Sequence, residues 1–221
     1  SVTARGTNVQ RKTTEYDRFG RVFQSFDSGD VPTGYLYDVA GRKIAEIRNF
    51  TEVSTPISDA NRANDLYTRY SYYKGLMRTT WVDINGNNAP DSGDQVTTYE
   101  YDATYTGGLS STLAFKNLLT KVTYPAGSGT NTVYYAYNAL GEQTKIKDQL
   151  GIVRETVFDN GGRKSLEKVT DFNSAASIST DIQRVELSYT NRGQVDTITP
   201  RPQAAARRIR SNTPTTAGAT W

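Results

Sequence analysis

The chain has 221 residues and a net charge of +3, from 26 basic and 23 acidic side chains interspersed along most of its length. A nucleic-acid-binding protein would carry a clustered basic stripe, so this pattern argues against nucleic acid as a partner. The chain has no Cys and no His. It therefore cannot form disulfides or thiolate and imidazole metal sites, and it lacks the commonest general base. No run approaches the ~18 apolar residues of a membrane-spanning helix.

The remaining composition favours thin β layers. Hydrophobic residues make up 36% of the chain and the mean hydropathy is −0.63, which is too polar for a large apolar core. Yet the chain holds 15 Tyr, 7 Phe and 2 Trp, which is too aromatic for typical disorder. Tyrosine combines an apolar ring with a polar tip, and it suits a sheet whose faces are only half dry.

The first elements in the chain are two copies of the pattern Y-D-x-x-G-R, which begin 21 residues apart at Tyr16 and Tyr37. An alternating run follows each copy, at residues 21–26 and 42–47, and period-two alternation is the strand signal. An Asp at the first turn position can bond the backbone two residues on, and Gly supplies the positive φ that closes a turn. Each copy therefore predicts one β-hairpin.

The middle of the chain departs from this pattern. Residues 49–68 have few β-formers and are predicted to be an insertion, after which Tyr72-Tyr73-Lys74-Gly75 is a shortened copy. Tyr101-Asp102 begins another copy whose glycine turn is replaced by a second insertion, near residues 103–117. Insertions in a repeat array usually project on one face, where partners bind.

A segment between these copies resembles a 12-residue calcium loop, in which oxygen ligands fall at positions 1, 3, 5, 9 and 12. Here those positions are Asp83, Asn85, Asn87, Asp91 and Asp94. The glycine of position 6 is replaced by Asn88, the glutamate of position 12 by Asp94, and no amphipathic helices flank the loop. The alternative is a solvated hairpin tip, because turns favour Asn, Gly and Asp. Calcium binding is thus a hypothesis at these five residues.

A second pair of copies begins at Tyr137 and Phe158, again 21 residues apart, and a weaker copy begins at Tyr189. Two pairs of copies share the 21-residue spacing, and all lie beside alternating runs, which argues against a chance origin of the repeat. The sequence therefore predicts an all-β fold: an array of stacked hairpins over residues 1–200 that forms a spiralling β-strip. Residues 201–221, with Arg207, Arg208 and Arg210, are predicted to be a linker or disordered tail.

These motifs resemble the YD-repeat, or RHS-repeat, family. Tyr124-Pro125-Ala126-Gly127 and the segment 144–151 are similar to phrases common in that family, and the resemblance covers about residues 10 to 200. The family includes bacterial polymorphic toxins, shell-forming subunits of toxin complexes and the teneurins. It implies hairpins that wind into a spiral and can enclose a toxin domain as a hollow shell. The family's cap with a self-cleaving aspartate is not recognisable here. Residues 1–11 are polar and show no signal peptide, and we expect the chain to be a fragment of a longer polypeptide.

The leading interpretation of function is structural: a non-catalytic scaffold in a secreted or cell-surface protein, built as a shell around cargo or as a fibre. The repeated Asp residues recur in step with the turns, whereas an active site is singular, so no catalytic or cofactor-binding residue is expected. Expected partners are flanking repeats or further copies at open sheet edges, with an encapsulated toxin or a surface glycan. The alternative is an adhesin that binds glycans or another cell, because aromatic rows such as Tyr16, Tyr37 and Tyr137 can stack on sugars.

Overall fold

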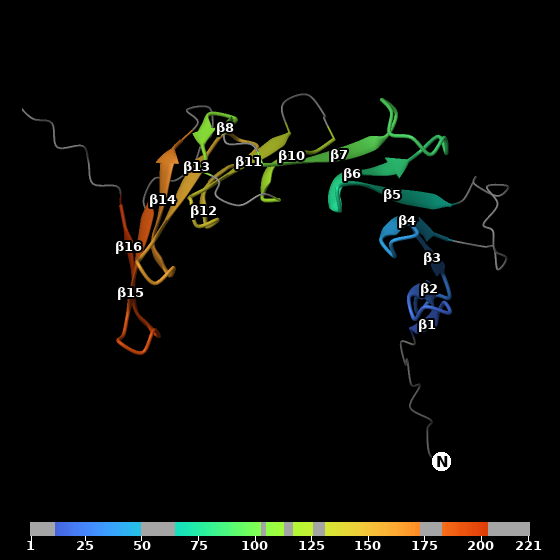
Figure 1. Ribbon diagram of the computed structural model, residues 1–221, viewed down its shortest axis with the longest axis horizontal. Helices are drawn as coiled ribbons and strands as arrows, with labels where there is room; N and C mark the ends of the chain where they lie inside the picture. The colour runs from blue at the N-terminus through green and yellow to red at the C-terminus, as the bar shows by residue number, and fades with distance from the viewer. Residues whose placement is uncertain are drawn as a thin grey trace, which may run out of the picture. The chain divides into compact units, whose positions relative to one another are not determined.

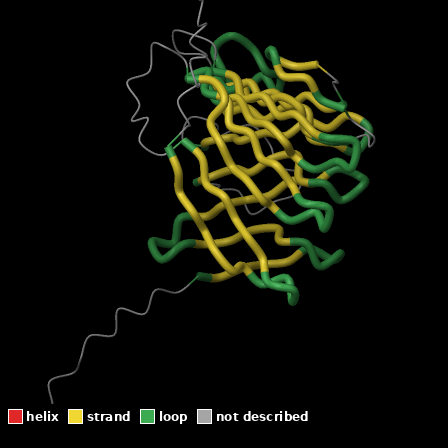
Figure 2. Tube along the Cα trace, turned by 90° about the vertical axis from the view of Figure 1, so that its left-hand side faces the viewer, coloured by secondary structure: helices red, strands yellow, loops and turns green. Residues whose placement is uncertain are grey.

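The computed structural model describes residues 12–49, 65–102, 105–112, 117–125, 131–172 and 183–202. These residues form strands and turns with no helix, and Figure 2 shows the turns at the two ends of the strands. The predicted all-β array of hairpins is confirmed. The chain divides into two compact units, Ser1–Gln149 and Leu150–Trp221.

In the first unit the hairpins pair side by side in chain order, and every pairing recorded between neighbouring strands is antiparallel (Figure 1). Among the described strands of this unit, β8 and β9 alone stand outside this order; they form a separate two-stranded sheet from the segment that connects β7 to β10 in sequence. The strands are β1 (Thr13–Tyr16), β2 (Val22–Phe26), β3 (Pro32–Tyr37), β4 (Lys43–Arg48), β5 (Leu66–Tyr73), β6 (Leu76–Asp83), β7 (Gln95–Tyr101), β8 (Tyr105–Thr106), β9 (Leu109–Ser110), β10 (Leu119–Thr123), β11 (Thr132–Tyr137) and β12 (Gln143–Lys147).

The second unit repeats the same plan with two hairpins. Its strands pair in the order β13-β14-β15-β16, each antiparallel to the next. They are β13 (Val153–Phe158), β14 (Lys164–Asp171), β15 (Arg184–Tyr189) and β16 (Val195–Arg201). The described residues end at 202, so nearly all of the predicted tail, with its basic cluster, lies outside them.

Three copies of the motif share one turn geometry, which we call the turn clasp. In the first, Asp17 Oδ1 accepts the backbone N–H groups of Phe19 and Arg21 at 2.8 and 2.9 Å. Its other oxygen, Oδ2, accepts the Arg21 guanidinium at 2.7 Å. Gly20, at a φ of 77°, closes the turn with a 3.0 Å bond to the Asp17 carbonyl. Asp38–Arg42 and Asp159–Arg163 make the same bonds.

Two further turns keep this geometry with different residues. At Asn138 the acid has become an amide and the arginine has become Glu142, so the side-chain bond persists with its polarity reversed: Asn138 Nδ2 donates to Glu142 Oε2 at 2.6 Å. Between β2 and β3, Asp27 bonds the backbone of Gly29 and Val31 in the same way, and Asp30 takes the glycine's place at a φ of 57°. The sequence motif did not identify this second turn, because its fourth residue is not glycine.

A tyrosine of the following hairpin links to each of the three clasped hairpins. Tyr37, which precedes Asp38, donates its hydroxyl to the carbonyl of Val22 at 2.8 Å, while the Arg21 guanidinium lies 4.5 Å from the Tyr37 ring centroid. We call this pair of contacts the tyrosine link. It recurs where Tyr72 bonds the Lys43 carbonyl under Arg42, and where Tyr189 bonds the Lys164 carbonyl under Arg163. Tyr137 makes the hydroxyl bond alone, to Leu119.

The insertion after Asp102 lies within a turn and leaves its closure intact. The N–H of Asp102 donates to the Leu118 carbonyl at 3.1 Å, as Asp17 does to Arg21, and Asn117 has the positive φ of the missing glycine. The inserted β8–β9 hairpin then contacts β11, where Ser111 exchanges hydrogen bonds with the backbone of Tyr137. Most of the other predicted insertion, residues 50–64, lies outside the described residues. The strands on its two sides, β4 and β5, pair directly.

The apolar core is thin, as the composition indicates. Its best buried side chain is Ile47 of β4, which packs with Tyr67 of β5 and the partly buried Leu36 of β3. Buried positions alternate along β4, β5 and β6, so one face of the sheet is drier than the other. With so little apolar burial, polar contacts such as the turn clasp and the tyrosine link carry a large part of the structural specificity.

The tyrosine link predicts a hydroxyl-specific loss of stability. Removing the hydroxyl with Tyr37→Phe should lower the free energy of unfolding by about 1 kcal/mol, because it deletes the bond to Val22 and keeps the ring under Arg21. Tyr16→Phe is the matched control, since Tyr16 precedes a clasp in the same way but is 64% exposed and has no hydroxyl bond within the described residues. Urea unfolding measures both, and equal effects would contradict the link.

The turn clasp predicts a stability difference that depends on pH. The backbone N–H of Arg42 is the main cause that holds the pKa of Asp38 below its ordinary value of 3.8, and the Arg42 guanidinium adds to it. A carboxyl whose folded-state pKa is lowered contributes stability above its unfolded value and loses it as the pH falls through the folded-state pKa. Asp38→Asn should therefore melt on the order of 2–4 °C lower than the parent at pH 7, and this gap should close in acid below pH 3.8.

The copy at Asn138 supplies a rescue variant for the same turn. The double variant Asp38→Asn with Arg42→Glu recreates the reversed pair of Asn138 and Glu142. Its melting midpoint at pH 7 should therefore lie between those of the parent and of Asp38→Asn alone. The regain is partial because the stacking of Arg42 on Tyr72, at 4.8 Å, is also removed. A double variant that melts below the single variant would show that the pair does not transfer between turns.

Candidate functional site

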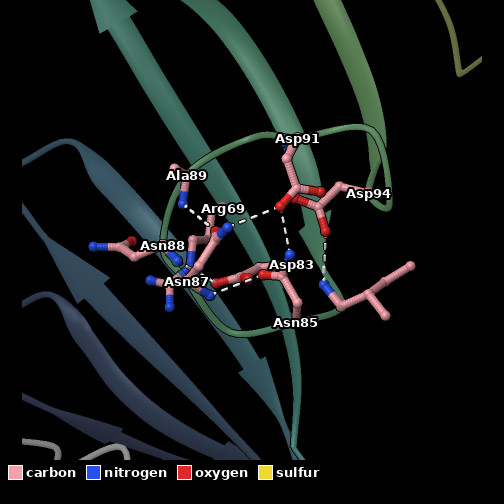
Figure 3. Close-up of polar contacts among 9 residues, drawn as sticks. Arg69, Asp83, Asn85, Asn87, Asn88, Ala89, Asp91 and Asp94 are labelled. Atoms are coloured by element: carbon pink, nitrogen blue, oxygen red, sulfur yellow. Dashed lines mark hydrogen bonds and ion pairs between the residues drawn. The ribbon is translucent and has the colours of Figure 1, made fainter.

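The loop that resembles a calcium site connects two strands that pair directly. Val82 near the end of β6 pairs with Gln95 at the start of β7, so the loop from Asp83 to Asp94 closes at its base. Hydrogen bonds among its own side chains and backbone hold it, as Figure 3 shows. The segment is thus an ordered tip with an internal polar network.

Asp91 is the centre of that network. Its Oδ2 accepts the side-chain amides of both Asn85 and Asn87, the latter at 2.8 Å, and its Oδ1 accepts the N–H of Gly93 at 2.8 Å. The Gly93 N–H and then the Asn85 amide lower the pKa of Asp91, so the carboxylate stays charged. The structure therefore brings three of the five predicted ligands together around one carboxylate oxygen.

Asp94 closes the loop on the other side. Its Oδ1 accepts the N–H of Ile84 at 2.9 Å, and its Oδ2 accepts the N–H of Asp91 at 3.3 Å (Figure 3). Asp94 thereby bonds the backbone at both ends of the loop. A cavity of about 660 Å³ adjoins this end, and Asp91, Asp94, Tyr124 and Asn131 are among the residues that line it.

Asp83 makes an ion pair that the sequence did not predict. Its side chain is fully buried, and its Oδ2 accepts Nε of Arg69, itself 9% exposed, at 2.5 Å. The N–H of Asn88 also donates to Oδ2, at 3.2 Å, whereas Oδ1 is buried with no hydrogen-bond partner. The signal for the pair lies in strand register: Asp83 pairs with Tyr67, two residues from Arg69 on the same face of β5.

The loop fits a calcium ion in part. Asn85, Asn87, Asp91 and Asp94 supply oxygens from one short segment, but the two amides now donate to Asp91 and would have to turn their carbonyl oxygens to an ion. Asp83 faces Arg69, a cation that competes for its charge. Across the described ranges no three carboxylate, Cys or His side chains gather in a way that could hold a metal. Calcium binding therefore stays a prediction, carried by the loop residues other than Asp83.

The structure shows what the repeated acids contact and whether any helix in the described residues could span a membrane. The repeated acids Asp17, Asp38 and Asp159 are all engaged in turn clasps with arginines four residues on. The described part of the chain contains no helix long and apolar enough to cross a membrane.

Comparison with known proteins gives resemblances to solved structures only. No family model matches the chain, and no curated protein matches it. Among solved structures, a TcdB2-TccC3-Cdc42 crystal structure aligns with 85% of this chain at 12% identity and a TM-score of 0.46. A TcdB2-TccC3 crystal structure aligns with 88% at 15% identity and 0.34, and a Photorhabdus luminescens Tc holotoxin pore with 90% at 13% identity and 0.31. This chain spans 10 to 12% of the length of those chains.

The buried ion pair predicts that replacing one partner lowers the free energy of unfolding much more than replacing both partners together. Arg69→Met should lower the free energy of unfolding by about 3–5 kcal/mol, because it leaves the buried carboxylate of Asp83 without a countercharge. Arg69→Met combined with Asp83→Leu should be much closer to the parent. Arg192→Met, at an exposed turn, controls for loss of an arginine. Urea unfolding measures all four proteins, and a double variant no better than the single would contradict the pairing.

The calcium hypothesis predicts a metal-dependent melting midpoint. Calcium at about 100 times its Kd would stabilise the folded chain by about 2.7 kcal/mol, which is a rise on the order of 5–10 °C over the chelated protein. Asp91→Asn should abolish the rise, because Asp91 is the central carboxylate, while Asp30→Asn, in the turn between β2 and β3, should keep it. Differential scanning calorimetry with calcium and with chelator decides the matter. An unchanged midpoint in the parent protein rules the site out.

Proposed function

We propose that the chain is a scaffold segment of a secreted or cell-surface protein, a non-catalytic β-strip that forms part of a shell around cargo or of an extended fibre. One observation carries the proposal: the residues that repeat along the chain are the residues that connect its hairpins. Asp and Arg build each turn clasp, and Tyr joins one hairpin to the preceding one. The repeated residues thereby hold consecutive hairpins together along the strip.

The end strands supply the connections that such a scaffold needs. Within the described residues β1 pairs only with β2, and β16 only with β15. Each end strand therefore presents an unpaired row of backbone groups, which is a template for another strand. On β16 the apolar side chains Val195 and Ile198 are 51% and 62% exposed. The partners that fit these edges are flanking repeats or a second copy of the chain.

The nature of the cargo and the location outside the cell follow from the resemblance to YD-repeat proteins. In that family hairpin strips enclose toxin domains, and the absence of Cys here is compatible with export. An enclosed toxin domain is accordingly the cargo that we propose for the shell form.

Self-association tests the scaffold role. The purified chain should assemble with rising concentration into elongated particles, seen by light scattering after size-exclusion chromatography and by negative-stain electron microscopy. Ile198→Lys should reduce assembly, because an edge lysine disfavours pairing with another strand. Leu140→Lys is the matched control, since Leu140 is 73% exposed at a hairpin tip and not on an end strand.

Two outcomes would count against the scaffold. A chain that remains monomeric at every concentration, together with an Ile198→Lys variant that behaves like the parent, removes the role of the edges. Discrete monomers that bind surface glycans would instead favour the adhesin alternative.

A further inference from the structure

The ladder between β6 and β7 stops short of the edge that carries the clasped turns. Its last pair toward that edge is Thr79 with Thr98. Beyond it, Leu76–Arg78 continue β6 toward the Lys74-Gly75 turn, and Tyr99–Tyr101 continue β7 paired with β10 and not with β6. The two strands therefore diverge, and a cavity of about 510 Å³ lies between them. This volume is within the range of small-molecule sites, about 300–1,000 Å³.

The cavity occurs where a tyrosine link is missing. Tyr101 precedes Asp102 as Tyr37 precedes Asp38, so the pattern predicts a bond from its hydroxyl to the preceding hairpin. That hairpin is the shortened copy, with a two-residue turn that has neither clasp aspartate nor clasp arginine. Among the described residues the Tyr101 hydroxyl has no hydrogen-bond partner, and burial raises its pKa, so it remains a proton donor. The departure from the repeat leaves this junction open.

Around the cavity the basic side chains lack acidic partners among the described residues, whereas the acidic side chains are engaged. Lys74 and Arg78 lie 5.3 and 5.8 Å from the centroid of the Tyr73 ring, and neither has a carboxylate partner among the described residues. The acids on the opposite side are engaged: Glu100 is bonded by Lys121 at 2.7 Å, and Asp102 accepts the N–H of Asn117. An anionic group is therefore the complement of the β6 side.

We propose that this cavity binds an acidic saccharide, a sugar unit that carries a carboxylate. The carboxylate would lie against Lys74 and Arg78, which offer charge-assisted hydrogen bonds. The sugar hydroxyls would meet the hydroxyls of Tyr101 and of Thr98, which line the same cavity. Tyrosine rings supply apolar surface for the C–H faces of the sugar ring beside those polar groups.

The site is independent of the scaffold role, because a strip can assemble without binding sugar and can bind sugar without assembling. A disaccharide of glucuronic acid and N-acetylglucosamine is the probe, and the same disaccharide with its carboxylate reduced to the alcohol is the neutral comparison. Saturation-transfer NMR and isothermal titration should give a Kd on the order of 1 mM for the acidic form. The neutral form should bind at least about ten-fold more weakly.

Variants locate the site. Arg78→Gln should weaken binding of the acidic disaccharide about ten-fold, while Arg192→Gln, the same change at an exposed turn of the second unit, should leave it unchanged. Tyr101→Phe should weaken both disaccharides, whereas Tyr16→Phe should weaken neither. Lys74→Gln, at the hairpin tip, gives a second measurement of the charge effect if Arg78→Gln melts below the assay temperature.

Three results would overturn the proposal. They are the absence of binding at 10-fold the expected Kd of about 1 mM, equal affinity for the acidic and neutral disaccharides, and unchanged affinity in both the Arg78→Gln and Lys74→Gln proteins. Self-association of the same samples, measured in parallel, reports on the scaffold role separately.

Discussion

This structure depends on the ion pair between a turn aspartate and the arginine four residues after it in the sequence. The pair closes a turn in which a single carboxylate satisfies two backbone N–H groups and one guanidinium. It also presents the guanidinium to the tyrosine of the following hairpin. The same arginine side chain therefore closes the turn within one hairpin and contacts the next hairpin. In a chain with so small an apolar core, this sharing explains how neighbouring hairpins keep one register.

The variations of the motif show which part of it is required. Asn138 and Glu142 exchange the chemistry of the pair and keep the bond, and Asp102 keeps the closing backbone bond around an inserted segment. The arginine is less constant than the turn: Glu142 has no cation to offer a tyrosine, and the residue before the next aspartate in the motif is Phe158, which has no hydroxyl. The division between the two compact units, after Gln149, falls between these two positions.

The repeats could be predicted from the sequence because their cause is local. Asp, Gly and alternating strands lie within ten residues of each other, so the hairpins at Tyr16, Tyr37 and Tyr137 follow from turn chemistry alone. The tyrosine link and the pairing of Arg69 with Asp83 join residues that are 14 or more positions apart, and strand register decides both. The residues of the calcium hypothesis follow from their spacing in the sequence, but spacing gives no indication that Asp83 faces an arginine.

In a repeat protein, side chains become free for specific chemistry where the repeat is interrupted. At a regular junction the aspartate bonds the arginine, the arginine lies against the tyrosine ring, and the tyrosine hydroxyl donates to a backbone carbonyl, so all three side chains are engaged. The open junction between β6 and β7 coincides with one local change, the shortening of a turn to Lys74-Gly75, which removes the clasp, and among the described residues the Tyr101 hydroxyl has no hydrogen-bond partner. The Asp83–Asp94 loop lies at the other end of the same two strands. Both candidate sites thus lie between β6 and β7, beside a turn that has neither the clasp aspartate nor the clasp arginine. We therefore expect ligand-binding chemistry in such a protein where the repeat is interrupted.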